Sequence, residues 1–592
     1  MVYLQTALIG LIALTLTPGL LFYFDVTPKV ALLLVGAASA VFATGRAPKW
    51  FSALLLLNAI SLGISAALSP NPALASFGTN WRRFGAVTQI AVWIFAWGVA
   101  SHAAAGKGRP RIVLRGITLA TALAAAYGVA QYFGWDPILP AAGYHIGEGV
   151  WTIVRPPGTF GYVSYFATWL AMAAFLAMAL AGIETSGAWR TLARFTAALA
   201  ALAMVLTGTR AAMAGTAVGL VVWLQRSGWR VSRRTATLAA ALIAAGALFY
   251  FSPAGSPLRS RTRWFVEDPL GGGRILLWRD TLRMSAKHPL FGFGPDVFMG
   301  EFPAFESKAL AQSYPDFAYE SPHNIFLDAL VAQGIPGLLI LAILVVAGFR
   351  AAARLTNPWI APALAAGLVS QQFTVFTVPT AALFLIAIGL AVALETDGHA
   401  PEYRLPWVAA VPVSLALLLL AARLLLADHA LALTKRAVDQ GMPRLAASEM
   451  QNYRRWRLPG SSADLWYSRA MLTLSNRLSD PSQRIEALVQ SRSAALVAPQ
   501  TSEDPFNAWY NLALAKATQQ DQAGTEASLR AAIHSHPNWF KPHWTLAQLL
   551  RLEGRLEESA REAALAVELD AGKHPEVTKT MEEIQRAQSP QK

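Results

Sequence analysis

The chain has 592 residues, of which 54% are hydrophobic and only 14% are charged, and it contains no cysteine. Soluble globular proteins carry about 25% charged residues, so the composition excludes a chain built only of soluble domains. The formal net charge of +14 is typical of proteins that bind nucleic acid. Much of this charge, however, lies in short loops between apolar segments, where it would face anionic membrane lipid. We therefore expect a membrane protein that binds no nucleic acid.

Long apolar segments follow one another from residue 1 to about residue 427, where charged residues become frequent. A helix needs about 20 apolar residues to cross the hydrocarbon of a bilayer. The sequence therefore predicts an all-α protein with a polytopic bundle of about 12–13 transmembrane helices. The longer candidates are residues 4–24, 50–69, 84–105, 112–133, 159–183, 324–349, 358–378 and 405–427, and the shorter ones are 30–43, 195–209, 211–225, 235–251 and 379–394.

Lysine and arginine gather in every second connection of this bundle, and cytoplasmic loops carry such an excess. The basic connections include residues 45–49, 106–115, 184–194, 226–234 and 350–354. We expect a bacterial inner-membrane protein with a cytoplasmic N-terminus, in which an odd number of spans places the C-terminal region in the periplasm. The first apolar segment has no basic n-region and no small-residue cleavage site, so we interpret it as a retained span.

One connection, residues 252–322, is much longer than the others and falls on the predicted periplasmic side. Long loops in compact domains are usually functional or disordered. This loop contains Gly-Gly-Gly-Arg274, a stretch of helical character up to His288, and then Pro-Leu-Phe-Gly-Phe-Gly-Pro. It ends at Ser-Pro-His323-Asn324, directly before the next span. We expect an ordered loop that carries part of the active site.

Residues 428–592 form a second, soluble domain with an internal repeat. Tyr510 recurs as Trp544 and Ala532 as Ala566, each 34 residues later. This spacing of large and small residues resembles tetratricopeptide repeats, whose stacked helical hairpins form concave binding surfaces. The domain is interpreted either as a docking platform for a protein partner or glycan, or as a structural cap on the membrane domain. His534, His536 and His543 lie close together, but no acidic or cysteine ligand accompanies them, so we expect no metal there.

The motifs in the membrane half occur in a known order. Gly-Gly-Arg274 precedes Trp278, then come His288–Pro295, Pro-His323-Asn324 and Gly-Ile-Pro-Gly337. Together they resemble the O-antigen ligase and O-antigen polymerase superfamily over about residues 71–394. Arg155-Pro-Pro-Gly-Thr-Phe-Gly and Thr-Gly-Thr-Arg210 are similar to two further motifs of these proteins. The chain departs from simple ligases by an extra span and the repeat domain after Glu395. It also has Ser164 and Tyr165 near the position where the family commonly has asparagine.

The resemblance implies transfer of a glycan from undecaprenyl diphosphate to an acceptor hydroxyl, with inversion at the sugar. Guanidinium groups match phosphate oxygens and stay protonated, so Arg210 and Arg274 are assigned to the diphosphate. His323 is assigned as the base that takes the acceptor proton, because its unperturbed pKa near 6.5 suits that role. On that value, activity would fall as pH drops through roughly 6 to 7. Each residue also has a structural interpretation. Arg210 would be an anchor at the membrane interface, Arg274 a solvated loop charge, and His323 a residue at the helix start that is bonded to backbone.

Further arginines on the predicted outer side are candidate substrate-binding residues. Arg279 lies little more than one helical turn after Arg274, so it would share the diphosphate or pair with Asp280 or Glu267. The other candidates are Arg155, Arg82 and Arg83, of which the last two contradict the distribution of basic loops. Each of these is expected to bind the diphosphate or an acceptor phosphate, and surface anchoring is the alternative.

Several motifs are absent from the sequence. There is no Asp-x-Asp, no His-Glu-x-x-His and no phosphate-binding Gly-x-x-x-x-Gly-Lys loop. We therefore expect no metal and no cofactor; a missed metal site would involve Asp296 or Glu320. The acceptor stays open between a lipid A-core, a lipid-linked repeat unit (a polymerase) and a protein (an O-oligosaccharyltransferase). A fourth hypothesis is a transporter. It is disfavoured because transporters place charges near the bilayer midplane, whereas the candidate site charges here lie on the predicted outer side.

Overall fold

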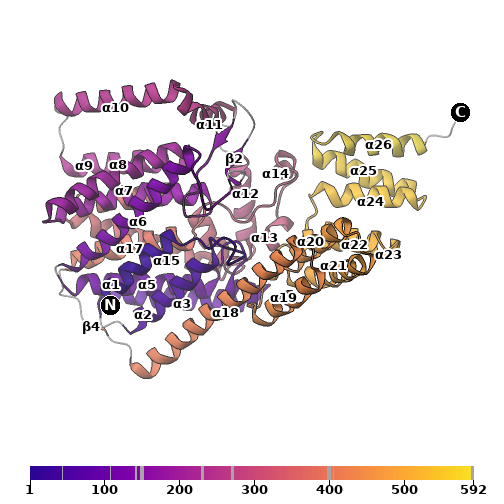
Figure 1. Cartoon of the computed structure of the whole chain (residues 1–592), viewed down its shortest axis with the longest axis horizontal. Coiled ribbons are helices and arrows are strands. Elements are labelled where there is room, and N and C mark those ends of the chain that lie inside the picture. Colours follow the sequence, from indigo (N-terminus) through magenta and orange to yellow (C-terminus); the bar gives the residue numbers. More distant parts are fainter. Residues whose placement is uncertain are drawn as a thin grey trace.

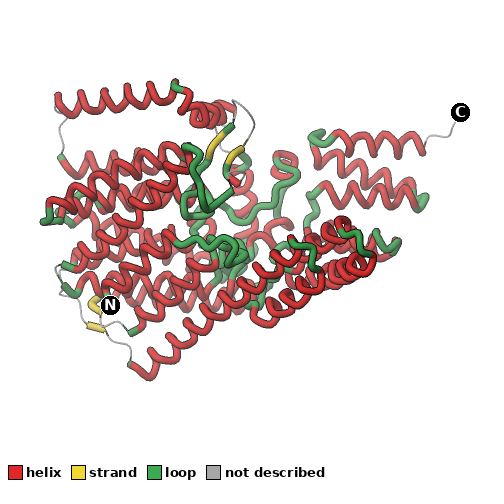
Figure 2. The backbone as a smooth tube through the Cα atoms, in the orientation of Figure 1, coloured by secondary structure: helices red, strands yellow, loops and turns green. Residues whose placement is uncertain are grey.

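The protein is described by a computed structural model, which is helical almost throughout (Figures 1 and 2). Two short antiparallel pairs are the strands in the described part: β1 (Gly45–Arg46) with β4 (Glu402–Tyr403), and β2 (His145–Ile146) with β3 (Ile153–Val154). The structure describes residues 1–42, 45–106, 108–140, 143–146, 152–228, 233–267, 272–396, 402–403 and 406–588.

The prediction of an all-α polytopic protein is confirmed, and each apolar segment overlaps a helix, although the first helix ends at Leu14 where the predicted segment continues to residue 24. Among the described residues, 8 helices are long and apolar enough to cross a membrane, or 9 with a bent pair at residues 240–263. Small residues in the buried core let these helices approach closely. The bundle consists of α1 (Val2–Leu14), α2 (Thr27–Val41), α3 (Lys49–Ala67), α5 (Ala86–Ala104), α6 (Arg109–Tyr132), α7 (Val163–Ile183), α8 (Gly187–Leu206), α9 (Arg210–Ser227), α10 (Arg233–Phe251), α15 (Ile325–Arg354), α16 (Ile360–Ser370), α17 (Val378–Glu395) and α18 (Trp407–Asp439), with the short α4 (Pro72–Phe77) after α3.

The predicted basic connections lie together at one end of the bundle, which we call the basic end. Arg115 pairs with Glu184 at 2.8 Å, the Arg226 guanidinium donates to the Ala353 carbonyl at 3.0 Å, and β1 pairs with β4. The remaining connections gather at the opposite end, which we call the loop end; it faces the C-terminal helices (Figure 2). The alternation seen in the sequence thus corresponds to two chemically different ends of one bundle.

The long connection between α10 and α15 is folded at the loop end. It contains six helical segments that pack between the bundle and the C-terminal region (Figure 1). Phe293, Val297, Phe298 and Phe302 are buried there, so apolar contacts hold this connection in one arrangement. The segments are η3 (Pro253–Gly255) with α11 (Ser256–Glu267), α12 (Arg274–Ser285), α13 (Phe298–Glu301), η4 (Phe302–Ala304) and α14 (Lys308–Ser313).

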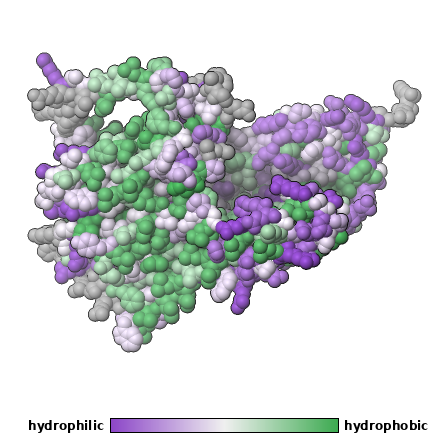
Figure 3. Space-filling model, in the orientation of Figure 1, coloured by the Kyte–Doolittle hydropathy of each residue, from purple (hydrophilic) through white to green (hydrophobic). Residues whose placement is uncertain are grey.

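The helix α18 leaves the membrane part without a break and continues past residue 427, where the sequence predicts the domain boundary. The chain then forms antiparallel helical hairpins, and Ala513, Ala532, Ala547 and Ala566 are buried where the helices meet. In Figure 3 the apolar surface covers the bundle, and hydrophilic residues cover these hairpins. The hairpin helices are α19 (Pro443–Trp456), α20 (Asp464–Arg477), α21 (Pro481–Thr501), α22 (Pro505–Ala517), α23 (Gln522–Ser535), α24 (Phe540–Leu552), α25 (Leu556–Asp570) and α26 (Pro575–Gln588).

Polar contacts attach these C-terminal helices to the long connection. His536 Nε2 lies 2.5 Å from Glu306 Oε2, both nearly inaccessible to solvent. Lys308 pairs with Glu568 at 2.8 Å, and Lys541 pairs with Asp316 at 2.6 Å. The hairpins therefore hold the same connection that carries Arg274 and leads to His323.

Candidate functional site

Four arginines from three connections approach one another at the loop end, and two of them, Arg261 and Arg274, belong to the long connection between α10 and α15. Arg155 follows β3, Arg210 is the first residue of α9, Arg261 lies in α11, and Arg274 is the first residue of α12. The positive charges of Arg155, Arg210 and Arg274 all act on the Arg261 guanidinium, which also interacts with the Tyr162 phenol. We call these four residues the arginine cluster. Like charges gathered in this way repel one another, and an anion bound between them relieves the repulsion.

A tight turn brings Arg210 and Arg261 together. Thr207, Gly208 and Thr209 connect α8 to α9, and the Thr207 hydroxyl donates to the Met204 carbonyl at 2.6 Å. Gly208 has φ +61, and its carbonyl accepts from Arg261 Nε at 3.4 Å. A Cβ atom on Gly208 would lie 2.6 Å from Arg261 Cγ, so a larger residue would push the two arginines apart.

The connection around Arg155 is fixed by buried polar groups. Gly158 N–H donates to the Gln131 side chain at 2.9 Å, and Lys29 Nζ donates to the Thr159 carbonyl. The Arg155 guanidinium lies 5.9 Å from the centre of the Tyr162 ring. The predicted motif at residues 155–161 is therefore an ordered loop, and it places Arg155 against the arginine cluster.

His323 lies at the start of α15 in a backbone conformation that is rare for residues other than glycine, with φ +51. The preceding carbonyl, of Pro322, accepts a hydrogen bond from the indole of Trp278 at 3.0 Å, and the Asn324 side chain caps α15. Strained backbone of this kind costs about 1–3 kcal/mol and clusters at functional sites. In the described part of the chain no hydrogen bond to the His323 imidazole is found, which differs from the interpretation as a ring bonded to the helix start.

The surroundings of His323 keep its imidazole neutral. Burial lowers the pKa of His323 to about 4, and the positive charges of Arg274 and Arg82 lower it further in the same direction. Because the charge of Arg274 acts on the His323 imidazole, His323 is electrostatically coupled to the arginine cluster. A neutral imidazole accepts a proton, which is the state that a general base needs. The bound diphosphate of a substrate would raise this pKa again, because it introduces negative charge.

Arg274 begins α12 directly after two glycines. Gly272 has φ +79, and a Cβ on Gly273 would lie 2.8 Å from the Leu310 side chain, so the chain turns closely around α14 at this point. Gly271 of the predicted motif lies outside the described residues. Because Trp278 on the same helix binds the Pro322 carbonyl, α12 fixes Arg274 and the backbone before His323 relative to each other.

Arg82 and Arg83 have different surroundings from the arginine cluster. Arg82 is buried and forms ion pairs with Asp296 at 2.6 Å and with Asp328 at 3.2 Å. Arg83, also buried, donates to the Asn80 side chain at 2.5 Å and has φ +53. The structure gives both guanidiniums partners within the protein. Substrate binding by Arg82 and Arg83 stays a prediction that the geometry does not favour.

Arg279 shows the second of its two predicted arrangements. Its Nε lies 3.0 Å from Asp280 Oδ1, and its Nη2 donates to the Ser307 hydroxyl at 2.7 Å. The buried Asp280 also binds Arg283 and the backbone N–H of Ser307. Arg279 therefore holds α12 to the segment before α14, and sharing of a diphosphate with Arg274 stays a prediction.

Sequence reasoning missed Arg261. The run Arg-Ser-Arg-Thr-Arg263 places arginines at alternate positions, so it does not show which one faces inward. In the structure Arg261 is 8% exposed, whereas Arg263 is exposed. A signal was present in the amphipathic pattern of α11, because only the inward position of a surface helix is buried.

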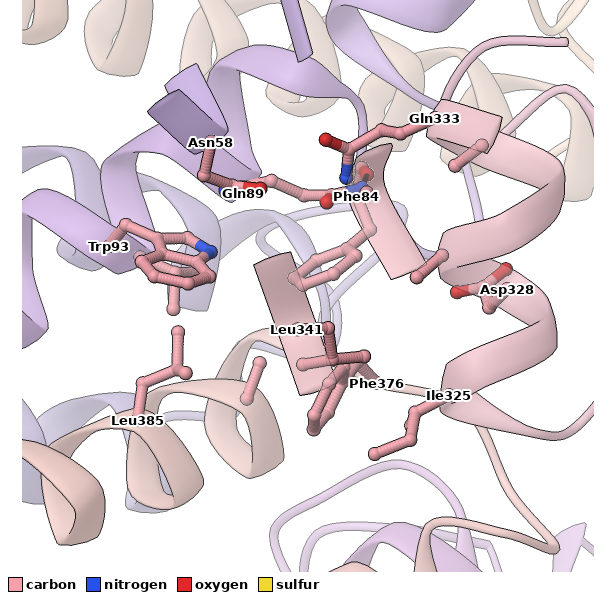
Figure 4. A pocket seen from close by; sticks show the side chains of 15 residues that line it. Asn58, Phe84, Gln89, Trp93, Ile325, Asp328, Gln333, Leu341, Phe376 and Leu385 are labelled. Atoms are coloured by element: carbon pink, nitrogen blue, oxygen red, sulfur yellow. Dashed lines mark hydrogen bonds between the residues drawn. The ribbon is translucent and has the colours of Figure 1, made fainter. Parts of the chain in front are cut away.

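An apolar cavity lies beneath the first turns of α15 (Figure 4). Phe84, Ile325 and Phe376 line it near the loop end, and Asn58 and Trp93 line it deeper in the bundle. Asn58 and Trp93 also line a second cavity of about 430 Å³, which runs along α3 and α5 toward Trp97 and Val413. The two cavities share a wall at Asn58 and Trp93.

No group of three or more histidine, cysteine or acidic residues in the described ranges has the arrangement of a metal site. The sequence indicates Asp296 and Glu320 as the ligands of any metal site that its motifs do not reveal. Asp296 accepts hydrogen bonds from Arg82, Thr79 and the Phe84 N–H. Independence of metal stays a prediction.

Comparison with known proteins supports the resemblance noted from the motifs. Residues 195–342 match the model of the O-antigen ligase family. An O-antigen ligase of Pseudomonas aeruginosa is 31% identical over 213 residues, which are 33% of this chain and 48% of the relative. The chain thus spans about half the length of this curated relative. The family match includes Arg210, Arg261, Arg274 and His323.

Proposed function

We propose that the protein transfers a glycan from a lipid-linked diphosphate to a hydroxyl group of an acceptor, as an O-antigen ligase does. The observation that supports this proposal is the convergence of four guanidinium groups from three connections beside a neutral histidine. Guanidinium groups bind phosphate oxygens through paired hydrogen bonds. The donor is a glycan linked to undecaprenyl diphosphate, and the diphosphate occupies the arginine cluster.

In the proposed reaction, His323 takes the proton from the acceptor hydroxyl. The oxygen forms a bond to the anomeric carbon of the donor sugar, and the bond from this carbon to the diphosphate oxygen breaks. Negative charge builds up on the departing diphosphate, where Arg155, Arg210, Arg261 and Arg274 stabilise it. Preorganised charges that act on the developing charge lower the barrier more than they strengthen substrate binding. This step requires no metal and no cofactor.

The polyprenyl chain of the donor occupies the second, larger apolar cavity. With the diphosphate at the loop end, the chain extends past Trp93 and Trp97 along α3 and α5. Burial of each CH₂ group contributes about 0.8 kcal/mol in protein interiors, but lipid already surrounds the chain, so the cavity positions the donor more than it increases affinity. The groove therefore aligns the donor for attack.

The loop end faces the periplasm of a bacterial inner membrane in this proposal, and the C-terminal helices lie on the same side. Support comes from the basic loops at the opposite end, which favour the cytoplasm. Reporter fusions after Arg354 and after Asn511 test the orientation. We expect cytoplasmic activity at the first position and periplasmic activity at the second, and the reverse result would contradict the proposal.

The acceptor is a lipid A-core oligosaccharide. A polymerase or a protein O-oligosaccharyltransferase would share the same donor site, so deletion of the gene separates the three. Polymerised glycan that stays unattached supports a ligase, glycan of one repeat unit supports a polymerase, and unglycosylated protein supports the third function. Purified protein in nanodiscs with undecaprenyl diphosphate-linked donor then tests the chemistry. Activity in excess chelator is expected, and activity that only Mg²⁺ or Mn²⁺ restores would contradict a metal-free reaction.

A further inference from the structure

A polar cavity of about 410 Å³ lies where the hairpins meet the loop end. It lies apart from the arginine cluster, and its walls come from three parts of the chain. Trp466, Arg469 and Thr473 belong to α20, Glu503 and Asp504 precede α22, and Tyr23, Asn80 and Met299 come from connections of the membrane part. Ligand pockets typically measure about 300–1,000 Å³, so this cavity has room for a small ligand or one part of a larger one.

The lining has the composition of a carbohydrate site. Two aromatic residues, Tyr23 and Trp466, provide flat apolar faces, and the other walls carry an arginine, two carboxylates, an amide and hydroxyls. Sugars combine apolar C–H faces with many hydroxyl groups that donate and accept, and the opposed polarities of this lining match that pattern. The two carboxylates disfavour a site built for phosphate alone.

Some of these polar groups have no partner in the described part of the chain. Arg469 is exposed and forms no hydrogen bond or ion pair there, although the charge of Asp504 acts on it. Glu503 uses one carboxylate oxygen to accept the Asn80 N–H at 2.5 Å. Burial raises the pKa of Glu503 to about 7, so near neutral pH its carboxyl group both donates and accepts hydrogen bonds.

Asn80 connects this cavity with the candidate active site. It lies two residues before Arg82, which binds Asp328 in the first turn of α15, directly after His323. The backbone between them is held by Asp296, which accepts from the Thr79 N–H at 2.8 Å and the Phe84 N–H at 3.0 Å. A ligand in the cavity therefore contacts the segment that positions the start of α15.

From this arrangement we infer that the cavity between α20 and the loop end binds sugar residues of the acceptor glycan and so holds the acceptor beside His323. This inference rests on the proposed function. The repeat-like hairpins are thus an acceptor-binding part of the transferase, in addition to a structural support. A protein acceptor is the competing occupant, and the cavity favours a glycan because its volume and mixed polar lining fit a few sugar rings.

The test uses the full-length protein in nanodiscs and, as probe, core oligosaccharide released from lipopolysaccharide by mild acid. Calorimetry measures its affinity for the wild type, Trp466→Ala and Arg469→Ala, with Arg477→Ala as the matched control. Arg477 lies on the same helix, is exposed and does not line the cavity. We expect affinity to fall about tenfold or more in the two cavity variants, because each loses stacking or charge-assisted hydrogen bonds, and to stay unchanged in Arg477→Ala.

Turnover separates this inference from the proposed function. Trp466→Ala and Arg469→Ala should raise KM for the acceptor and leave kcat within about twofold, because the cavity lies apart from the reacting atoms. Equal oligosaccharide affinity in all four proteins would overturn the inference, and so would a loss of protein glycosylation with unchanged oligosaccharide binding. If the oligosaccharide binds as expected but no glycan is transferred from any lipid-linked donor, the proposed function fails while the binding site stands.

Discussion

Two groups of arginines at the same end of the bundle differ in their neighbours. Arg82 is buried between Asp296 and Asp328, and Arg83 lies against Asn80 in the wall next to the hairpins. In the arginine cluster, in contrast, the positive charges of Arg155, Arg210 and Arg274 all act on the Arg261 guanidinium. A guanidinium with carboxylate partners stabilises the fold, whereas guanidiniums facing one another store repulsion that an anion relieves. Both groups consist of arginines at the same end of the bundle, so residue type and position do not distinguish them. The sign of the neighbouring charges does: it is negative around Arg82 and positive around Arg261.

The largest effect is expected for the residue that lies between the two groups. His323→Ala should lower the single-turnover rate by roughly 10²- to 10⁴-fold, the range that general base catalysis supplies. Donor affinity should stay nearly intact, because the arginine cluster is unchanged. Single-turnover assays and donor titrations in nanodiscs measure both quantities, with His288→Ala as a control in an exposed histidine of the same connection. Turnover close to that of the wild type would show that His323 is not the base.

Arg82→Gln should destabilise the fold. It leaves Asp296 and Asp328 without their counter-charge, and breaking a buried ion pair costs about 3–5 kcal/mol. Thermal unfolding in detergent should show a much lower Tm, with Arg283→Gln as the control because the Arg283 side chain is exposed and its partner Asp280 keeps Arg279 as a counter-charge. Normal stability combined with weak donor binding would move Arg82 into the substrate site, as the sequence first indicated.

Arg261→Gln tests the cluster itself. The loss of one charge-assisted contact to diphosphate should weaken donor binding by about 1.5–3 kcal/mol. Arg263→Gln, on the exposed side of the same helix, should bind the donor like the wild type. Titration with lipid-linked donor measures the affinities of both variants and of the wild type. If both variants lose affinity equally, the effect is one of overall charge and the cluster is not a specific site.

The pH dependence of the reaction should reflect both groups of arginines. The pKa of His323 lies near 4 in the free protein because of burial, Arg274 and Arg82, so the base stays unprotonated well below pH 6. The acid limb of kcat/KM, which reports the free enzyme, should therefore lie below the 6 to 7 expected from the sequence. The acid limb of kcat, which reports the enzyme with substrate bound, should lie at higher pH, because the bound diphosphate raises the pKa of His323. Coinciding limbs near pH 6.5 would contradict this environment.

The smallest effect is expected at Arg279. The Arg279 guanidinium is partly exposed, and its hydrogen bonds go to the buried Asp280 and to Ser307. Arg279→Gln should therefore change donor affinity only slightly, whereas Arg274→Gln on the same helix should weaken it clearly. The two variants are compared in the same donor titration. Equal losses would place Arg279 in the diphosphate site together with Arg274.

Much of this molecule was predictable from its sequence, for identifiable reasons. Apolar length alone locates a membrane helix, so each predicted span overlaps a helix of the bundle. Local motifs identified Arg210, Arg274 and His323, which the structure brings to one end. The partners of Arg82, however, lie 214 and 246 residues away in the sequence, at Asp296 and Asp328. Such distant pairing leaves no local pattern. Arg261 was missed for a related reason, because only packing decides which of three alternating arginines is buried.

The uninterrupted course of α18 sets the height at which the hairpins stand above the membrane. A helix rises about 1.5 Å per residue, so its 33 residues extend roughly 50 Å. Arg423 on this helix donates to the Trp456 carbonyl at 2.9 Å, and the Tyr23 N–H donates to Asp428 at 3.0 Å, so both neighbours brace it. These contacts hold α18 in place, whereas a flexible tether would let the hairpins move. Under the proposed function, we expect acceptors whose glycan ends at the matching height to be aligned with the transfer site.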